Sequence, residues 1–261
     1  KLVKLSERVW YYPYESDRDR PNLGYVRGDN WSLAIDAGHS AAHTEEFYSA
    51  LSEEGLPLRS LTVLTHWHWD HTFGMHAVNG LCIANRKTNQ YLLDFKERIL
   101  QNGSDFFLDM HETIRKEYCN NTPVIVKPAD IVFDGELFLD AGNCRIRLFQ
   151  AESPHTDDST LVHIIDEKLL FIGDANCGEF PSGIKDRDLV DRFVAALTSA
   201  DVERCLEGHW TPDTPKGIIE DIAEDKYDYI IVNDEVPKAA AKMEAIMLAE
   251  KCRSNRNMES I

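Results

Sequence analysis

The sequence predicts a single α/β domain spanning residues 1–261. The chain has 261 residues, of which 43% are hydrophobic, which is enough for one large domain with a substantial core. Short apolar runs that end at glycine, aspartate or asparagine are typical of strands, and they alternate with segments of helical spacing. This strand-helix-strand recurrence appears in both halves, and no low-complexity linker separates them.

The first half of the chain is expected to be mainly strands. Gly28, Asp29 and Asn30 supply turn chemistry for a hairpin, and Gly55 and Pro57 would end a helix. We therefore expect strands over residues 2–14, 23–26, 31–35, 61–64 and 81–84 and a helix over 43–54.

The second half begins with a change in composition. Residues 87–121 are rich in Leu, Phe, Glu, Lys and Arg at helical spacing, and an interruption at 102–104 predicts two helices. Four strand-like runs follow within 123–150, read as 124–126, 131–133, 137–140 and 146–150. Beyond them the pattern predicts a hairpin over 161–165 and 169–172, a helix over 187–199, and a helical tail over 214–261 with helices at 218–229 and 236–253. This tail could cap the core or pair with a second subunit, so a homodimer is one alternative.

Charge and cysteine content narrow the choice of partners and compartment. The formal net charge is −17 and the pI is about 4.9, which disfavours binding to nucleic acid or to an anionic membrane. The six cysteines include no Cys-x-x-Cys pair, which fits reduced thiols in the cytoplasm. No run approaches the length of a membrane span, and the first fifteen residues lack the apolar centre of a secretory signal. A small molecule is therefore the expected partner.

The most informative stretch is Thr62 to Gly74, TVLTHWHWDHTFG. A buried strand ends abruptly at four side chains that can bind a metal: His66, His68, Asp70 and His71. Alternate residues of an extended segment point the same way. His66 and His68 can therefore hold one ion while Asp70 and His71 face another.

Three further candidate ligands follow downstream, each at the end of a strand-like run. His155 follows IRLFQ after a short loop, Asp174 ends LLFIGD, and His209 follows CLEG. Any one of them alone would more commonly be an ordinary surface or core residue. His163 lies inside a predicted strand without a partner in the motif, so we interpret it as a core histidine.

Together, His-x-His-x-Asp-His and the three later residues resemble the signature of the metallo-β-lactamase superfamily. The resemblance implies a four-layer αβ/βα sandwich: two mixed β-sheets packed together and flanked by helices, with metals at one edge of the sheets. It also implies that one metal is held by His66, His68 and His155, and the other by Asp70, His71 and His209, with Asp174 bridging the two.

The resemblance implies hydrolysis at two zinc ions, although iron or manganese would accept the same ligands. A hydroxide that bridges two Lewis acids would attack a small carbonyl substrate, namely an ester, lactone, thioester or β-lactam. Asp70 is the expected catalytic residue, because one carboxylate oxygen can bind metal while the other orients the nucleophile or carries a proton. Gly-x-Ser-x-Gly is absent, which argues against a serine hydrolase.

Several other residues are candidates for supporting roles. Asp36, in Asp-Ala-Gly, is expected to orient a ligand loop by hydrogen bonding, with a turn residue as the alternative. Expected pocket residues are Trp67, Phe106, Phe107, Cys177, Phe180 and Lys185. For most of these the alternative is packing: Trp67 could lie beneath the loop, the two phenylalanines could bury the inserted helices, and Cys177 could be a buried thiol. Glu179 lies in the same loop as Phe180. Lys185 could hold a substrate carboxylate or remain solvated.

Departures from known subfamilies leave the substrate open. Asp174 stands where many metallo-β-lactamases have Cys or Ser, which favours dinuclear hydrolases such as glyoxalase II and the lactonases. However, Pro154-His155-Thr156-Asp157-Asp158 differs from the Gly-His-Thr-x-Gly-His of glyoxalase II. The alternatives are a mononuclear iron oxygenase of the persulfide dioxygenase type, a phosphodiesterase on the same scaffold, and a non-enzymatic descendant.

Overall fold

The structure, a computed structural model, describes residues 1–58, 60–225 and 236–251. The chain divides into two units, Lys1–Ile219 and Glu220–Ile261. Both β-sheets lie in the first unit. The prediction of one domain over 1–261 stays a prediction. In the described residues no helix is long and apolar enough to cross a membrane.

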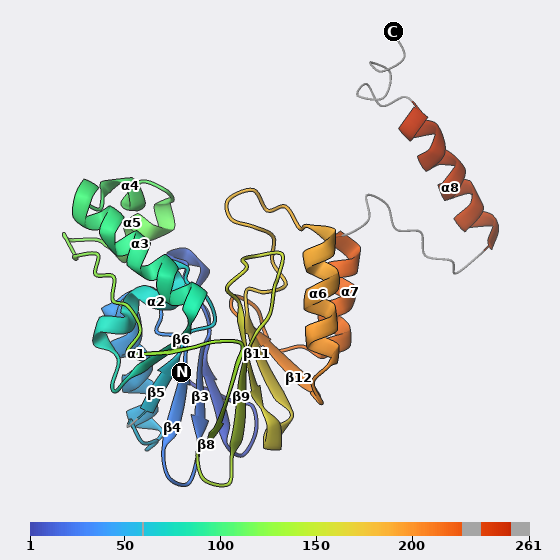
Figure 1. Ribbon diagram of the computed structural model, residues 1–261. Helices are drawn as coiled ribbons and strands as arrows, with labels where there is room; N and C mark the ends of the chain where they lie inside the picture. Colours follow the sequence, from blue (N-terminus) through green and yellow to red (C-terminus); the bar gives the residue numbers. More distant parts are fainter. Residues whose placement is uncertain (59, 226–235, 252–261) are drawn as a thin grey trace. The chain divides into compact units, whose positions relative to one another are not determined.

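The first unit contains two mixed β-sheets packed face to face, with helices on the outer faces (Figure 1). The seven-stranded sheet has the order β1-β2-β3-β4-β5-β6-β7, antiparallel from β1 to β4 and parallel from β4 to β7. Its strands are β1 Val3–Lys4, β2 Val9–Tyr12, β3 Leu23–Arg27, β4 Ser32–Ile35, β5 Ser60–Val63, β6 Cys82–Asn85 and β7 Ile131–Phe133. The predicted αβ/βα sandwich is confirmed.

The five-stranded sheet has the order β12-β11-β10-β9-β8 and is antiparallel except for the parallel pair β11 and β12. Its strands are β8 Glu136–Asp140, β9 Arg145–Gln150, β10 Thr160–Ile164, β11 Leu169–Gly173 and β12 Arg204–Glu207. The carboxyl ends of β9, β11 and β12 meet at one edge of this sheet. The main core lies between the two sheets and includes Leu33 and Val63 from one sheet and Leu148 and Phe171 from the other.

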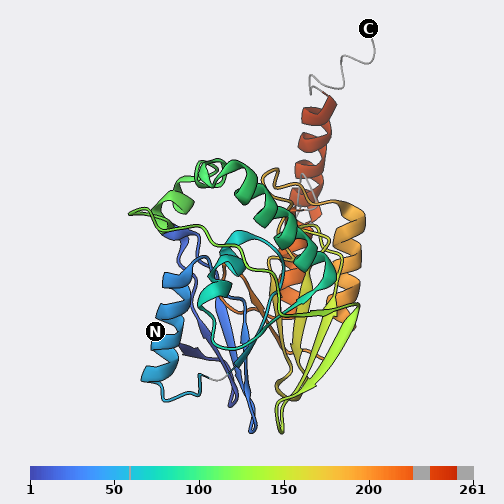
Figure 2. The same ribbon diagram turned by 60° about the vertical axis from the view of Figure 1, so that its left-hand side comes forward.

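Helices cover the outer faces because their apolar stripes match the sheet surface. The seven-stranded sheet carries α1 Ala41–Glu53, whose Phe47 and Leu51 pack on Tyr25. Figures 1 and 2 show three inserted helices gathered over one end of the sheets: α3 Arg86–Asn102, α4 Asp105–Leu108 and α5 Glu112–Glu117. α6 Arg187–Thr198 covers the five-stranded sheet, and α7 Pro215–Asp225 and α8 Val236–Lys251 follow.

The predictions of individual elements were mostly accurate, with three errors. The single strand expected over residues 2–14 is instead the antiparallel pair β1 and β2, separated by residues 5–8. The insertion forms three helices instead of two, because Asp109 to His111 separates α4 from α5 after the break at Gly103. The apolar run at 124–126 forms no strand, since Val124 and Val126 instead pack against the cluster of inserted helices. The predicted helical segments at 226–235 and 252–253 lie outside the described residues.

Candidate metal centre

The seven predicted ligands lie close together, and each follows the end of a strand in one of the two sheets. His66 and His68 follow β5, and the short helix α2, Trp69–Thr72, carries Asp70 and His71. Three loops of the five-stranded sheet supply the rest, after β9, β11 and β12; these residues are His155, Asp174 and His209. The backbone N–H of Thr160, where β10 begins, donates to the Thr65 carbonyl at 2.6 Å. The ligand loops of the two sheets are thereby joined directly.

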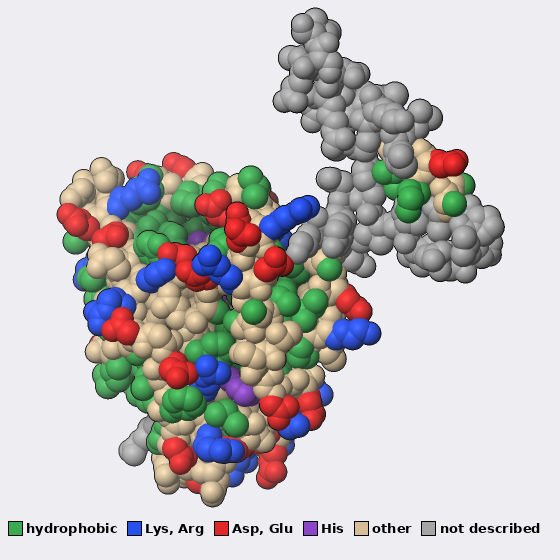
Figure 3. Space-filling model, turned by 45° about the vertical axis from the view of Figure 1, so that its right-hand side comes forward, with side chains coloured by type: hydrophobic (Ala, Val, Ile, Leu, Met, Phe, Trp, Pro, Cys, Tyr) green, Lys and Arg blue, Asp and Glu red, His purple; other side chains and the backbone are tan. Residues whose placement is uncertain are grey.

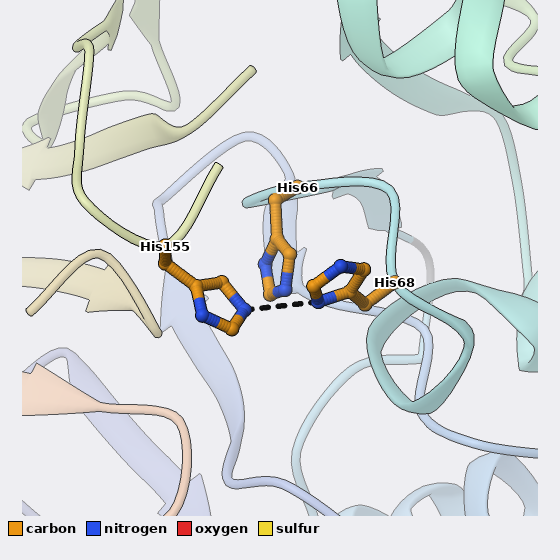
Figure 4. Close-up of side chains that lie close together, drawn as sticks. All are labelled: His66, His68 and His155. Carbon is orange, nitrogen blue, oxygen red and sulfur yellow. Dashed lines mark hydrogen bonds between the residues drawn. The ribbon is translucent and has the colours of Figure 1, made fainter. Parts of the chain in front are cut away.

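The seven side chains form two groups of potential metal ligands, and the ligand atoms within each group lie within 4.8 Å of one another. The first group is His66, His68 and His155; the second is Asp70, His71, Asp174 and His209. Figure 4 shows the three imidazoles of the first group converging on one point. His155 Nε2 and His68 Nδ1 are 2.9 Å apart, so these two nitrogens face each other.

Carboxylates lie between histidines in the second group. Asp70 Oδ2 is 3.2 Å from His71 Nε2 and 3.0 Å from His209 Nε2. Asp174 Oδ2 is 3.6 Å from His209 Nε2 and 3.8 Å from His155 Nε2, so this carboxylate touches both groups. Asp174 therefore occupies the position expected of a bridge. A Cβ at Gly208 would collide with Asp174 Oδ1, which means that the β12 loop must approach as bare backbone.

Three of these donor atoms fit a cation better than any protein partner. His66 Nε2, His71 Nε2 and Asp174 Oδ1 are buried and form no hydrogen bond among the described residues. Leaving a buried polar atom unsatisfied is costly. The donor set of imidazole nitrogens and carboxylate oxygens suits zinc, iron or manganese. The residues present therefore fit two divalent metal ions.

Hydrogen bonds behind the ligands fix the orientation of the imidazole rings. His155 donates Nδ1–H to the Gly178 carbonyl at 2.8 Å, which leaves its Nε2 as a ligand. Asp36 Oδ2 accepts from His71 Nδ1 at 2.7 Å, and the Asp36 carboxylate also accepts from the backbone N–H and the hydroxyl of Thr65. Asp36 has φ 63°, a left-handed conformation that aspartate tolerates. The structure thus places Asp36 where the sequence predicted, beneath the ligand loop.

Electrostatics differ between the two groups. Burial, reinforced by neighbouring histidines, lowers the pKa of His66 well below its usual value and that of His68 to about 3, so both are neutral and able to bind metal. Burial opposes charge on His209 as well, but Asp174 and Asp70 raise its pKa to about 9. A divalent cation would take the place of such protons, so metal binding releases them.

Asp70 and Asp174 themselves are held ionised. Burial alone would raise the pKa of each carboxyl, but His71 and His209 outweigh it and hold both pKa values well below the usual range. Two buried carboxylates therefore remain available as anionic ligands.

The candidate pocket residues divide into two sets. Trp67, Cys177 and Phe180 line cavities that adjoin the ligands. Phe106 and Phe107 are not among the residues that line these two cavities. The prediction was wrong for Phe107, which is fully buried in the core of the inserted helices, and it stays a prediction for Phe106, which is partly buried and packs on Phe95. The spacing of the two phenylalanines reflects packing among the inserted helices. Lys185 is not among the residues that line either cavity.

Sequence reasoning missed several cavity residues. Asp19, Tyr91, Asp157 and Trp210 all line the cavities. Asp157 and Trp210 adjoin the motif residues, so proximity in sequence could have indicated them. Asp19 and Tyr91 come from distant segments that carry no motif, and nothing in the sequence marks them. His163, as expected, lies buried in β10, with its Nε2 3.3 Å from the Asp201 carbonyl.

Comparison with known proteins agrees with this geometry. The sequence profile of the family described as "Metallo-beta-lactamase superfamily" matches residues 17–219, which include all seven ligand positions. The chain belongs to the metallo-β-lactamase superfamily. It is accordingly a metallohydrolase of that fold with two groups of potential metal ligands. The family match ends at residue 219, where the first compact unit also ends.

Solved metallo-β-lactamases share the fold at low sequence identity. The enzyme from Pontibacter korlensis is 17% identical with a TM-score of 0.59, covering 85% of this chain and 97% of that one. The enzyme from Hirschia baltica is also 17% identical with a TM-score of 0.59, covering 88% and 99%. DIM-1 metallo-β-lactamase is 19% identical with a TM-score of 0.58, covering 87% and 98%. These similarities establish the fold and leave the substrate open.

A short segment is also similar to guanylate kinases. The kinase of Desulfitobacterium hafniense (strain Y51) is 58% identical over 31 residues, and that of Caldanaerobacter subterraneus subsp. tengcongensis is 50% identical over 34 residues. These stretches are 12% and 13% of this chain, which spans only 16% of the length of either kinase. Similarity over so small a part does not show membership of the kinase family.

Proposed function

We propose that this superfamily member is a dinuclear zinc hydrolase that cleaves a small ester, thioester, lactone or β-lactam. The observation that carries the proposal is the pair of buried ligand groups, complete in both halves and touched by the shared carboxylate of Asp174. A mononuclear oxygenase would have no need of the second group. The buried, ionised Asp70 and Asp174 favour two dications over one.

Divalent metals in these groups would supply Lewis acidity toward the substrate carbonyl and would lower the pKa of water. The residues of the chain have distinct tasks around that chemistry. Asp36 and the Gly178 carbonyl hold His71 and His155 in the tautomers whose Nε2 faces the centre. Asp70 Oδ2 faces His209 within the second group, which leaves its other oxygen to accept from water and orient it.

In the overall reaction, water adds its oxygen to the carbonyl carbon and the bond to the leaving alcohol, thiol or amine breaks. The leaving group takes a proton that ultimately comes from the same water. Asp70 is the carboxylate of the second group other than Asp174, which also lies near His155 of the first group. It therefore has the catalytic role in the proposal, as a positioning acceptor for water.

The deciding experiment combines elemental analysis of the purified chain with a substrate panel. The panel contains a chromogenic β-lactam, a lactone, a thioester and a phosphodiester. About two zinc ions per chain and turnover of one carbonyl substrate are expected from two complete ligand groups. Turnover of the phosphodiester alone would replace a carbonyl substrate with a phosphoryl one. About one iron per chain, with oxygen uptake on a persulfide and no hydrolysis, would overturn the proposal.

A further inference from the structure

Two adjoining cavities lead to the ligand groups, and the side chains that line them indicate the chemical class of the substrate. The inner cavity, about 280 Å³, reaches Asp70, Asp174 and His209. The outer cavity, about 570 Å³, continues from it toward α6. The two share His68, His155 and Phe180, so one elongated molecule could occupy both.

Apart from the ligand histidines, the charged side chains in the walls of both cavities are acidic. Asp19 lines the inner cavity, and Asp157, Glu179 and Asp186 line the outer one. Among the described residues, neither lining includes a lysine or arginine. Away from the ligand groups, a substrate carboxylate would thus have no lysine or arginine of either lining to pair with, and a role for Lys185 in holding one stays a prediction.

Not all of these carboxylates are available. Asp157 is neutralised, since Lys87 Nζ lies 2.8 Å from one oxygen and the Tyr91 hydroxyl donates to the other at 2.8 Å. Among the described residues, the Glu179 carboxylate accepts a hydrogen bond only from the Ser182 hydroxyl, and Asp186 caps α6 by accepting from backbone N–H groups. Within the part of the chain that the structure describes, neither Glu179 nor Asp186 forms an ion pair.

Asp19 is the best placed of the acidic residues and is held rigidly. Its backbone is left-handed, with φ 53°, and its carbonyl accepts from His39 Nδ1 at 3.0 Å. Trp69 Nε1 donates to Asp19 Oδ2 at 3.3 Å. Its other oxygen has no hydrogen-bond partner among residues 1–58, 60–225 and 236–251, so it remains free to bind a ligand. A preorganised carboxylate loses little side-chain conformational entropy when it binds a ligand.

Aromatic rings complete both cavities. Trp69, Phe180 and Trp210 line the inner cavity, while Trp67 and Tyr91 line the outer one. The face of an aromatic ring attracts a cation, and the attraction is strongest for tryptophan. Aromatic rings combined with unpaired carboxylates bind an ammonium group better than any neutral or anionic group of the same size.

We propose that the substrate is a small ester or thioester that carries an ammonium group. This inference rests on the proposed hydrolase function and adds its substrate class. The ammonium group would contact Asp19, or Glu179 and Asp186, while the acyl carbon faces the ligand groups. The net charge of −17 draws cations toward the molecule from a distance. Figure 3 shows acidic and basic side chains interspersed on one face, so attraction there is not concentrated in one surface patch.

The first test measures binding alone, in the metal-loaded protein, by quenching of tryptophan fluorescence. The probes are choline and 3,3-dimethylbutan-1-ol, in which carbon replaces the charged nitrogen. We expect choline to bind at least about tenfold more tightly, a difference of about 1.4 kcal/mol. The variants Asp19→Asn and Glu179→Gln/Asp186→Asn should reduce that preference, whereas Glu45→Gln, an equal change of charge on the exposed face of α1, should not. Equal binding of the two probes would overturn the inference.

The second test measures hydrolysis of three matched thioesters: acetylthiocholine, S-(3,3-dimethylbutyl) thioacetate and S-acetyl-3-mercaptopropanoate. We expect kcat/KM to be highest for the cationic compound by at least about tenfold. Faster hydrolysis of the anionic or neutral thioester would overturn the substrate class but leave the hydrolase proposal standing. Choline selectivity without hydrolysis of any ester would have the opposite meaning: the cation site would stand and the hydrolase proposal would fail.

Discussion

At the residue scale, Asp174 links the two ligand groups, because its Oδ2 lies near both His155 and His209. Replacing it by alanine should remove the second ion and reduce hydrolysis at least about a hundredfold. The fold should persist, since Asp174 lies in a loop outside the sheet core. Metal content, kcat/KM and circular dichroism would be measured together.

The matched control for Asp174→Ala is His163→Gln, a histidine of β10 that contacts the Asp201 carbonyl and no ligand. It should retain both ions. Full activity of Asp174→Ala with one ion per chain would contradict the dinuclear scheme, and loss of an ion from His163→Gln would mean that a ligand has been misassigned.

Asp36 determines which nitrogen of His71 is available to metal. Asparagine suits the left-handed backbone at this position equally well. In Asp36→Asn, however, the amide N–H₂ can face His71 Nδ1 and force the tautomer whose Nε2 carries the proton. Affinity for the second ion should fall about 10- to 100-fold, while the first ion is retained. A two-site metal titration would measure this, with the exposed Asp29→Asn as the control. Unchanged affinity for the second ion would show that Asp36 is only a turn residue.

At the element scale, one buried carboxyl connects α3 to the loop that carries His155. Asp158 accepts from the Thr88 hydroxyl of α3 at 2.7 Å and from the Thr156 hydroxyl at 2.6 Å. Asn85, the N-cap of α3, also donates to Thr160, at the start of β10. The inserted helix thus supports the ligand loop from behind, although its phenylalanines do not line the cavities.

Asp158 should make stability depend on pH. Burial raises its pKa to about 6, from 3.8, despite the two threonine hydroxyls. The folded state therefore holds the proton more tightly than the unfolded state, and stability is lost as pH rises from 3.8 through about 6. The loss should be on the order of 3 kcal/mol. Because buried histidines titrate in the same window, urea unfolding after metal chelation should show this loss as a difference between the parent chain and Asp158→Asn that shrinks as pH rises from about 4 to 6.

The neighbouring carboxyl provides a control for that slope. Asp157 is hydrogen-bonded to Lys87 and Tyr91, which outweigh partial burial and lower its pKa. Its contribution to stability is present above its unfolded pKa and is lost only as pH falls below it. Asp157→Asn should therefore leave the slope between about pH 4.5 and pH 7 unchanged. A difference in stability between the parent chain and Asp158→Asn that does not change with pH in that window would contradict the assignment to Asp158.

Local sequence patterns predicted most of the elements and failed where packing decides. The run at β5 followed by His66 and His68 predicted both a strand and its function, since a buried strand and a cluster of ligands are both encoded locally. The run that contains Val124 and Val126 has an equally strand-like sequence, but these side chains pack on helices. Tertiary contacts, and not the local sequence, determine this outcome. The same limit explains Phe107, whose burial depends on helices from elsewhere in the chain.

At the scale of the whole molecule, the same contrast separates ligands from cavity walls. The seven ligands were predictable because metal binding restricts both residue type and spacing. The residues of the cavity walls were not predictable. Asp19 lines the inner cavity from a loop before β3, and Tyr91 lines the outer cavity from α3. No rule of spacing connects such positions, and only the folded chain brings them together.

All seven ligand positions and both sheets lie within Lys1–Ile219. A chain that ends at Asp225, the last residue of α7, should therefore keep its metal content and its kcat/KM within about twofold of the full chain. Elemental analysis and kinetics of the two chains, prepared in parallel, would test this. Loss of an ion on shortening would show that residues beyond 225 support the centre.

Each ligand group draws on both sheets: His66 and His68 meet His155 across the sheet interface, and Asp70 and His71 meet Asp174 and His209. Bound ions would therefore fasten one sheet to the other. At a free metal concentration one hundred times the dissociation constant, each independent site adds about 2.7 kcal/mol to the free energy of unfolding. Chelation should lower the melting temperature, as calorimetry would show. An unchanged melting temperature would mean that the folded chain binds the ions no more tightly than the unfolded chain does.

Because neither sheet alone offers a complete site, metal capture must come after the two sheets have docked during folding. The ions then stabilise a pair of sheets that has already docked, and they do not nucleate its formation. The moment of metal uptake would mark the end of folding, and a destabilised core would first become visible as leakage of metal.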